Sequence, residues 1–564
     1  MNRRTAHTTS SVVPGRTIIQ GSWPTIAAFA FAAPATAAVD QGLALEPRSP
    51  LAKAELAARP AHDHRLTVKF TDSARTRIDQ AGRLKSLSWA DLQPLKDLFA
   101  ATSGVDGHVF QPLVDMPQAE LEAMLQSAEE RSGRIQPDLA GMMWVDVPLA
   151  SMEAFARILH ASDLVEYVYY QQIAPPPPGW FGEAPDSCTD LAPLTNSYFG
   201  FQGYHRATTG IGMSAAWDVP GGRGQGVNEA DCEYWFDGDH EDLCNIISEP
   251  GQTPDPFILD LGWDEHGTAV MGEMVGGDNG YGVTGLVPEA QAYFFPELTV
   301  EGGSRRVSSI SRAIGTLNAG DVVLLEMQTT GPGGDFAPAE LDPSVWIVTR
   351  VGTDRGVSIV AAAGNGNQDL DSPAYAEYRS RGDSGAIVVG AGSSRGSRSK
   401  LGFSTFGSRV NVQAWGENVF TTGYGSFIRV GGDDRQSYTN FFSGTSSASP
   451  IVASAVVSLQ GIHRASIGEP MDPVALRQLL MDTGKPQGSG GQIGPLPDMA
   501  AAVDTLLSGF CRADVDGDGD LTLFDFLAFQ SLFDAGEDSA DFDDDGRLTL
   551  FDFLAFQTDF DAGC

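Results

Sequence analysis

The segment that decides the fold lies at residues 443–450 and has the sequence SGTSSASP. Glycine at position 444 lets the backbone turn closely, and Ser446 then falls in the opening turn of a helix that continues through the small and apolar residues 451–459. A serine in this place exposes its hydroxyl, and nearby backbone N–H groups can hold a negatively charged oxygen. The segment predicts a nucleophilic serine, although a serine at a helix start can also simply cap the helix.

A serine is a weak nucleophile alone and needs a base, which in turn needs an orienting acid. His266 lies in the segment DEHGTAV at 264–270, where a histidine followed by Gly-Thr and an apolar run suits the start of a buried helix. Asp231 directly follows a short, weak strand candidate at 226–230. We therefore expect His266 to be the base and Asp231 the acid, with a satisfied core histidine and a loop cap as the respective alternatives.

Asn365 is the candidate donor for an oxyanion. It follows a predicted strand at 357–363, in the loop GNGN, and α/β folds place functional loops at strand ends. Gly-Asn-Gly alone is also a common turn. The order Asp, His, Asn, Ser, with each residue at a strand end or a helix start, predicts an acyl-transfer site.

Short runs rich in Val, Ile and Ala alternate with helical windows from about residue 185 to 510, and many of these runs end in a glycine-rich loop. The clearest strands are predicted at 321–327, 357–363 and 386–391. Buried parallel strands with helices on both faces produce this pattern, so the expected fold class is α/β.

At this point the chain resembles the subtilisin-like serine peptidases, the subtilase family, over about residues 200–507. The resemblance rests on Ala230-Asp231 with the downstream segment DHEDL at 239–243, on HGT at 266–268, on GNG at 364–366 and on GTSSASP at 444–450. It implies a parallel sheet with helices on both faces. It also implies that Ser446 is the nucleophile, His266 the base and then acid, and Asp231 the orienting carboxylate, with Asn365 and the Ser446 amide as the oxyanion hole.

The match to the family's acid motif has departures. His240 falls in the second half of that motif and is interpreted as structural. Glu229 lies two residues before Asp231, on the same face if the strand continues, and a second carboxylate so close raises the pKa of one of the pair. The alternative is that Glu229 reaches solvent. The related sedolisins use Glu in place of the histidine, and His266-Gly267-Thr268 argues against that branch.

The N-terminus is typical of an exported protein. Arg3, Arg4 and Arg16 precede an apolar stretch at 23–33 and the small residues ATAA at 35–38, which is the pattern of a signal peptide over residues 1–38. A leader without a sorting role is the alternative. No other segment is long and apolar enough to cross a membrane, so we expect a secreted or cell-surface enzyme.

Residues 39–174 have the pattern of a small α/β domain, with strands predicted at 65–70, 143–148 and 165–171 and helices at 118–131 and 150–161. A proline-rich linker follows at 175–184 and leads to the peptidase region at 185–510. This N-terminal domain resembles, loosely, the propeptide that subtilases carry. A permanent N-terminal domain is the alternative.

Residues 511–564 contain two copies of one sequence, because LTLFDFLAFQ occurs at both 521–530 and 548–557. Oxygen ligands at alternate positions with a sharp glycine turn are what Ca²⁺ needs. The candidate calcium ligands are Asp514, Asp516, Asp518, Asp520 (through its backbone carbonyl) and Asp525 in the first copy, and Asp541, Asp543, Asp545, Arg547 (through its backbone carbonyl) and Asp552 in the second. A solvated acidic run is the alternative.

Aspartate at the twelfth loop position and the lack of an entering helix make this pair resemble dockerin repeats. The resemblance implies a cohesin-like or cell-surface partner. Leu523-Phe524 and Leu550-Phe551 occupy the places where dockerins often carry Ser or Thr. These four residues either form an exposed apolar patch or pack the two halves together, and we expect the packing. A disulfide between Cys511 and Cys564 is plausible, and the pairing of the other three cysteines is left open.

The net charge of −37 argues against nucleic-acid and membrane-surface partners, and −13 of it lies in residues 511–564. Together the features predict a secreted serine endopeptidase that needs no cofactor for its chemistry and carries a calcium-binding C-terminal module. The alternatives are a scaffold protein that keeps the fold without turnover and a non-peptidase hydrolase such as an esterase.

Overall fold

A computed structural model of the chain describes residues 45–56, 64–79, 82–88, 90–103, 110–145, 147–172, 191, 195–508, 513–516, 521–543 and 546–562. The predicted signal peptide at 1–38 and linker at 175–184 lie outside these residues, as do Cys188, Cys511 and Cys564. Within the part that is described, no helix combines the length and apolar character needed to cross a membrane.

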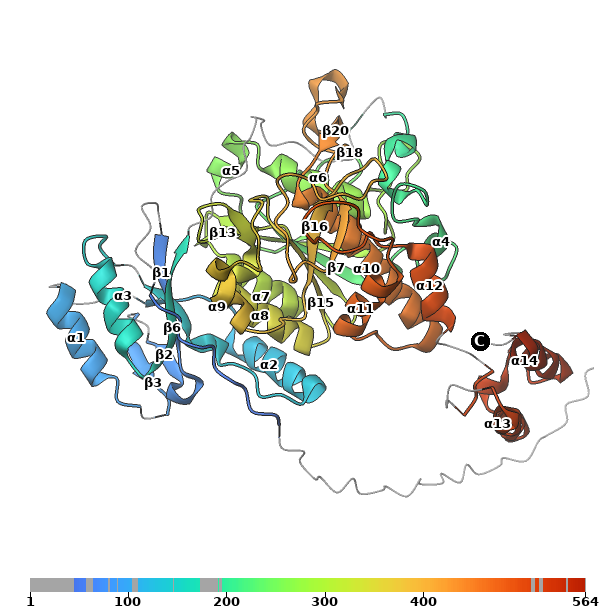
Figure 1. Cartoon of the computed structure of the whole chain (residues 1–564), viewed down its shortest axis with the longest axis horizontal. Helices are drawn as coiled ribbons and strands as arrows, with labels where there is room; N and C mark the ends of the chain where they lie inside the picture. The colour runs from blue at the N-terminus through green and yellow to red at the C-terminus, as the bar shows by residue number, and fades with distance from the viewer. Residues whose placement is uncertain are drawn as a thin grey trace, which may run out of the picture. The chain divides into compact units, whose positions relative to one another are not determined.

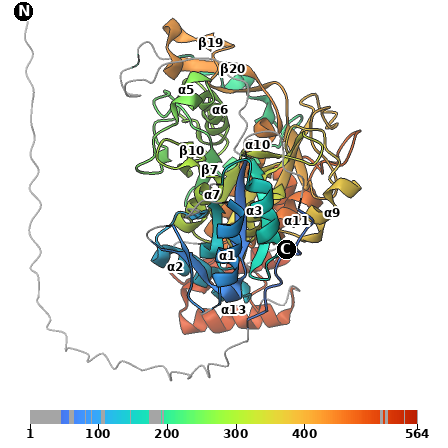
Figure 2. The same cartoon turned by 90° about the vertical axis from the view of Figure 1, so that its left-hand side faces the viewer.

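The N-terminal part is a four-stranded antiparallel sheet in the order β4-β5-β1-β6. Figure 1 shows two of its strands, β1 and β6, side by side. The strands are β1 (His64–Phe70), β4 (Phe110–Pro112), β5 (Met142–Val145) and β6 (Val165–Gln172), with a small hairpin of β2 (Thr76–Ile78) and β3 (Leu84–Ser86). Helices α1 (Gln93–Ser103) and α3 (Met152–Ala161) pack side by side (Figure 2). Because β5 and β6 both pair with β1, the predicted β-α-β unit is split by β1.

Helix α2 (Gln118–Ser132) shares one apolar cluster with α7 (Arg306–Thr316) and α8 (Pro343–Asp354). Hydrogen bonds join the same parts of the chain: the Tyr169 hydroxyl donates to Asp342, and the Gln171 amide donates to that carboxylate at 3.0 Å. The Arg134 guanidinium pairs with Asp354. The N-terminal sheet is thus bonded to the start of α8 through the end of β6.

The central sheet has seven strands in the order β17-β16-β15-β12-β7-β9-β8, and every pair in it is parallel, as predicted. Its strands are β7 (Asn228–Glu233), β8 (Ile247–Ser248), β9 (Gln291–Pro296), β12 (Val322–Leu325), β15 (Ser358–Ala362), β16 (Ile387–Gly392) and β17 (Val412–Trp415). Most of their residues are buried, which explains the nearly continuous apolar runs in the sequence.

Helices cover both faces of this sheet, in agreement with the α/β prediction (Figure 1). On one face lie α6 (Asp264–Val275) and the long α10 (Thr445–Ile467), with α4 (Ser214–Trp217), α11 (Pro473–Thr483) and α12 (Met499–Ser508) packed around them. On the other face lie α7 and α8. Smaller elements are α5 (Pro256–Asp260), α9 (Ala376–Ser380), the hairpins β10 (Leu298–Thr299) with β11 (Gly303–Ser304) and β13 (Gln328–Thr330) with β14 (Phe336–Pro338), and the sheet of β18 (Val419–Thr422), β20 (Ser437–Phe442) and β19 (Ile428–Arg429).

The C-terminal part contains α13 (Leu523–Ala535) and α14 (Leu550–Ala562), one from each copy of the repeat. Phe529 and Phe556, which occupy the same position in the two copies, stack at a centroid distance of 4.2 Å with an interplanar angle of 3°. Both rings are fully buried. The two copies therefore form a single apolar core.

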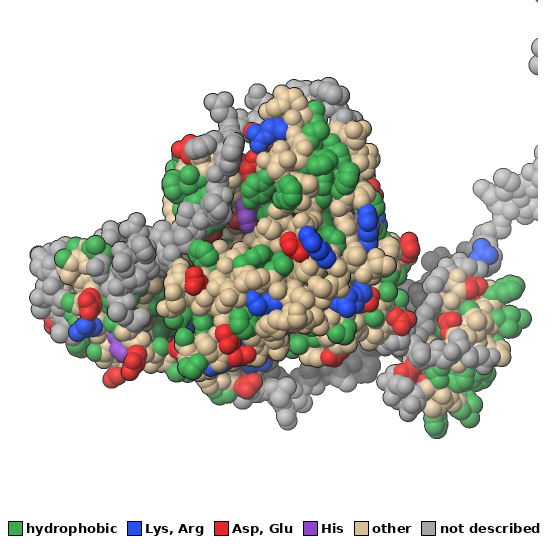
Figure 3. Space-filling model, turned by 45° about the horizontal axis from the view of Figure 1, so that its top comes forward, with side chains coloured by type: hydrophobic (Ala, Val, Ile, Leu, Met, Phe, Trp, Pro, Cys, Tyr) green, Lys and Arg blue, Asp and Glu red, His purple; other side chains and the backbone are tan. Residues whose placement is uncertain are grey.

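The expectation that Leu523-Phe524 and Leu550-Phe551 pack the two halves together is wrong. These four side chains are 66–69% exposed, and apolar side chains project from the C-terminal part in the space-filling view (Figure 3). The packing is done instead by residues deeper in each helix, among them Phe526, Phe529, Phe553 and Phe556. The repeated sequence has an apolar residue on several sides of the helix, and only one of these sides meets the other copy.

Candidate active site

Ser446 is the second residue of α10, as the sequence predicts, and it is 6% exposed. Gly444 precedes the helix with a φ of 117°, a conformation that residues with a side chain rarely adopt. A Cβ on this glycine would lie 3.3 Å from the Asn365 side-chain nitrogen. The glycine therefore allows the serine turn and the asparagine to approach each other closely.

Asn365 follows β15 and is held against the start of α10. Its Oδ1 accepts hydrogen bonds from the Thr445 backbone N–H at 2.8 Å and from the Thr445 hydroxyl at 3.2 Å. Its own backbone N–H donates to Gln328 Oε1 at 3.0 Å. These bonds commit the side-chain oxygen, so the amide NH₂ group remains to donate beside Ser446, where the sequence places an oxyanion donor.

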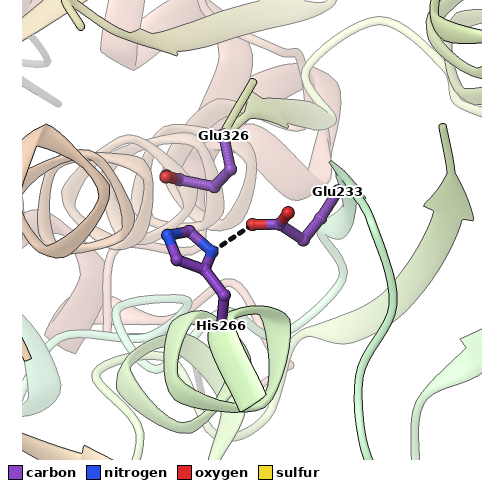
Figure 4. Close-up of side chains that lie close together, drawn as sticks. All are labelled: Glu233, His266 and Glu326. Carbon is purple, nitrogen blue, oxygen red and sulfur yellow. Dashed lines mark hydrogen bonds and ion pairs between the residues drawn. The ribbon is translucent and has the colours of Figure 1, made fainter. Parts of the chain in front are cut away.

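His266 is the third residue of α6, and its Nδ1 is hydrogen-bonded to the Glu233 carboxylate (Figure 4). The Glu233 side chain is 2% exposed and that of His266 is 13% exposed. The imidazole also packs edge-on against the Phe442 ring at 5.4 Å. A buried carboxylate on Nδ1 fixes the ring orientation and leaves Nε2 as the nitrogen that can exchange a proton with substrate or nucleophile.

The expected partner of His266, Asp231, is not brought to it by the structure. Asp231 lies two residues earlier on β7, is fully buried, and its two carboxylate oxygens have no hydrogen-bond partner among the described residues. Successive side chains of a strand alternate between faces, so Asp231 and Glu233 share a face, but only Glu233 stands at the end of the strand, near α6. The carboxylate that is hydrogen-bonded to His266 is therefore that of Glu233 and not that of Asp231.

The signal that could have located Glu233 is the end of the strand. The predicted strand stopped at residue 230, whereas β7 runs on to Glu233. Functional side chains of parallel sheets lie just at or beyond the carboxyl ends of the strands. With the true end of the strand, the same rule selects Glu233.

Glu326 is a further residue of the site that sequence reasoning did not find. It directly follows β12, the neighbour of β7, and its backbone N–H donates to the Cys232 carbonyl at 3.4 Å. Ser449 donates its hydroxyl to Glu326 Oε1 at 2.6 Å, and the Ser446 hydroxyl favours the ionised form of this carboxyl group, which lowers its pKa. Figure 4 shows the Glu326 carboxyl group beside the imidazole, on a different side from Glu233.

Several carboxyl groups lie buried on the same face of the sheet. Glu229 and Glu273 are fully buried, and, as with Asp231, both oxygens of each lack a hydrogen-bond partner in the described chain. Burial raises the pKa of Glu229 to about 8 and that of Glu273 above its usual range. For Asp231, burial and then the charges of Glu233, Glu326 and Glu229 raise the pKa. Glu229 thus does not reach solvent.

His266 and His240 have opposite electrostatic surroundings. Burial opposes protonation of His266, but the charges of Glu233 and then Glu326 outweigh it, and the pKa of His266 is raised. His240 is fully buried, and burial lowers its pKa to about 4. Its Nε2 pairs with the Ser437 carbonyl at 2.9 Å, and its Nδ1 accepts from the Asp242 N–H at 3.2 Å. This arrangement fits a structural histidine.

Three groups of described side chains have ligand atoms within 4.8 Å of one another: Glu233, His266 and Glu326; Asp514, Asp516 and Asp525; and Asp541, Asp543 and Asp552. The last two are the predicted calcium loops, and Asp525 and Asp552 are fully buried in them. Carboxylate oxygens in this number fit Ca²⁺. Asp518, Asp520 and Asp545 lie outside the described residues, while Arg547 is described.

Comparisons with known proteins agree with this fold. Residues 236–495 match the model of the Subtilase family. The chain is 27% identical over 282 residues to an intracellular serine protease of Paenibacillus polymyxa, covering 48% of this chain and 78% of that protein. It is 32% identical over 190 residues to Subtilisin DY of Bacillus licheniformis, covering 34% of this chain and 61% of that protein. It therefore spans less than two thirds of the latter's length.

A solved structure of proteases from Pseudoalteromonas arctica aligns with a TM-score of 0.41 and 21% identity, over 56% of this chain and 99% of that chain. The family match contains His266, Asn365 and Ser446 and begins after Glu233. The chain therefore contains a region at residues 236–495 that is similar to the Subtilase family, within the α/β fold described above.

Proposed function

We propose that this chain is a secreted serine endopeptidase that cleaves peptide bonds through Ser446, His266 and Glu233. The observation that carries the proposal is the hydrogen bond that Nδ1 of a histidine at a helix start donates to a buried carboxylate, combined with a serine and an amide donor at another helix start. These are the nucleophile, base, orienting acid and oxyanion donor that acyl transfer needs.

In the proposed mechanism Ser446 Oγ attacks the scissile carbonyl carbon while its proton passes to His266 Nε2. The carbonyl oxygen becomes an oxyanion and accepts hydrogen bonds from the Asn365 amide and the Ser446 backbone N–H. His266 then gives the proton to the leaving amine, the C–N bond breaks, and an acyl-enzyme remains. Water, deprotonated by His266, releases the acid product and restores Ser446. The Glu233 carboxylate, hydrogen-bonded to Nδ1, stabilises the imidazolium.

Ser446→Ala is expected to abolish covalent labelling by a fluorophosphonate, because the reagent forms its bond with an activated serine oxygen. Labelling is read as a fluorescent band, with wild type as the positive control and Ser447→Ala as the matched control, since the Ser447 hydroxyl faces Trp415 and Gly444 carbonyls. A label that persists in Ser446→Ala would refute the assignment. A wild-type protein that takes no label would favour a scaffold without turnover.

Profiling wild type with a peptide library separates a peptidase from an esterase. A peptidase cleaves members of the library, and the cleaved set would also report its side-chain preference. An enzyme that takes the label, hydrolyses simple esters and leaves every peptide intact would be an esterase instead.

The remaining assignments belong to the same proposal. Residues 1–38 act as a signal peptide and 39–174 as a propeptide that is removed by cleavage near the linker at 175–184, leaving the peptidase region 185–510. The contacts of Tyr169 and Gln171 with Asp342 support the propeptide role, because they bind the N-terminal sheet to the peptidase region. Residues 511–564 bind two Ca²⁺ ions and attach the enzyme to a cohesin-like or cell-surface partner.

Removing Ca²⁺ is expected to unfold the C-terminal module while the melting of the peptidase region stays largely unchanged. Asp514, Asp516 and Asp525 in one loop, and their counterparts in the other, repel one another without a cation. The measurement is circular dichroism and differential scanning calorimetry of the Ser446→Ala chain with EGTA and with excess Ca²⁺. A Mg²⁺ titration serves as the control, and a melting profile that ignores Ca²⁺ would contradict the calcium assignment.

A further inference from the structure

Glu326 is a buried carboxylate that the proposed mechanism does not use. It is 5% exposed, and the Ser449 hydroxyl, one turn along α10 from Ser446, fixes its Oε1 at 2.6 Å. Its backbone is anchored to β7 through the Cys232 carbonyl. The side chain is therefore held in place by both the sheet and the helix that carries the nucleophile.

The imidazole of His266 lies between two carboxylates. Glu233 is hydrogen-bonded to Nδ1, and Glu326 lies on a different side of the ring, with ligand atoms of all three residues within 4.8 Å of one another (Figure 4). An ionised carboxylate at this range favours the protonated form of an imidazole, and low exposure weakens screening by solvent. One carboxylate suffices to orient the ring, so the second has another effect.

We propose that Glu326 is a positioning residue that acts on His266 from the side away from Glu233 and stabilises the imidazolium formed when Ser446 gives up its proton. This inference rests on the proposed function of the same site. Glu326 makes and breaks no bond to the substrate. In the active form, which is reached once His266 and Glu326 have lost the proton they share, Glu326 is a carboxylate. During acylation the proton moves only from Ser446 Oγ to His266 Nε2 and then to the leaving amine.

The charged and titratable groups around this pair come from four segments. His266 faces two carboxyl groups, those of Glu233 at the end of β7 and of Glu326 after β12. The neighbours of Glu326 are His266, the Ser446 and Ser449 hydroxyls of α10, Glu233 and Asp231 of β7, and Glu273 of α6. Burial raises the pKa of Glu326 to about 8, and the charge of His266 opposes this rise. At neutral pH the two groups therefore hold a proton between them.

This shared proton has a definite effect on the pH profile. Only neutral His266 can accept the Ser446 proton. Activity therefore appears as the pH rises and His266 and Glu326 lose the proton they share. The acidic limb of the kcat/KM profile then lies at higher pH than it would for a histidine beside a single carboxylate. Glu326→Gln keeps the shape and a hydrogen-bond acceptor for Ser449 but removes the charge. We expect the limb to move down by about one pH unit or more.

The same variant is expected to lose up to about tenfold in kcat/KM on the alkaline plateau, because a weaker base accepts the Ser446 proton less readily. The variant should thus be faster than wild type on the acidic side and slower on the alkaline side, and the two profiles should cross. A residue with a merely structural role would lower the whole profile without moving the limb. The proposal would be overturned if the two pH profiles did not cross and the acidic limb of the variant lay within roughly 0.2 pH units of that of wild type.

Asp231→Asn is the matched control, because it removes a similarly buried carboxyl group that does not lie against His266. The acidic limb of this variant's pH profile should stay where it is in wild type. The second readout is the titration of His266 followed by NMR in the Ser446→Ala background, which needs no activity. A His266 pKa that falls on Glu326→Gln, in a protein that cleaves no peptide, would uphold the role of Glu326 and reject the peptidase. If the protein cleaves peptides and the His266 pKa does not change in Glu326→Gln, the peptidase is upheld and the role of Glu326 is rejected.

Discussion

Glu233→Gln is expected to lower kcat for peptide hydrolysis by about 10⁴-fold with little change in KM. The amide of glutamine can donate a hydrogen bond to His266 Nδ1, which places the ring proton on Nε2. That nitrogen then cannot accept the Ser446 proton. The same loss should appear in the rate of fluorophosphonate labelling, which can be measured before any peptide substrate is known.

Asp231→Asn supplies the comparison that decides between the two acids. Because Asp231 makes no hydrogen bond to His266 and is buried two residues away on the same strand, its variant should retain kcat within about tenfold. If Asp231→Asn instead loses four orders of magnitude and Glu233→Gln does not, the acid is Asp231 and Glu233 has no role in orienting the base.

Glu229→Gln is expected to raise the stability of the peptidase region at pH 8 and to leave it nearly unchanged at pH 4. The folded-state pKa of Glu229 is raised from 4.5 to about 8, so the folded protein holds a proton that the unfolded chain has released. Its contribution to stability is fully present below pH 4.5 and is lost as the pH rises toward 8. At 1.36 kcal/mol per pKa unit, the shift from 4.5 to about 8 corresponds to a loss of about 5 kcal/mol.

The measurement is the melting temperature of the peptidase region at pH 4, 6 and 8 in the Ser446→Ala background, where self-cleavage is absent. We expect a gain of about 5 °C or more at pH 8. Glu469→Gln is the control, because it neutralises an exposed carboxylate of the same peptidase region. Its melting temperature should differ little from that of the parent protein. The predicted link between the Glu229 pKa and stability would be contradicted if the protein with Glu229 were more stable at pH 8 than at pH 4 and Glu229→Gln gave no gain at pH 8.

The places of Ser446, His266 and Asn365 in the fold could be predicted because each is tied to a local signal. Ser446 and His266 begin helices whose first turns are recognisable from glycine and small residues, and Asn365 follows a strand with a nearly uniform apolar composition. In these three cases the neighbouring residues alone specify where the element begins or ends.

The approach of Glu233 to His266 could not be predicted in the same way. Asp and Glu are disfavoured in strands, so the sequence NEADCE is a poor strand by composition, and the expected strand ended at residue 230. Tertiary packing overrides that preference, because β7 is the central partner of β12 and β9. Glu326 was missed for a different reason: it comes from a distant segment, and the register of parallel strands does not follow from spacing along the chain.

The stacked rings of Phe529 and Phe556 have an evolutionary consequence for the C-terminal part. Each ring is buried because it packs against its counterpart in the other copy. Deleting one repeat would therefore expose the remaining phenylalanine to solvent. A chain that lost a single copy would expose an aromatic surface and a half-built core. We expect lineages of such enzymes to keep both copies or to discard both, with no stable intermediate of one repeat.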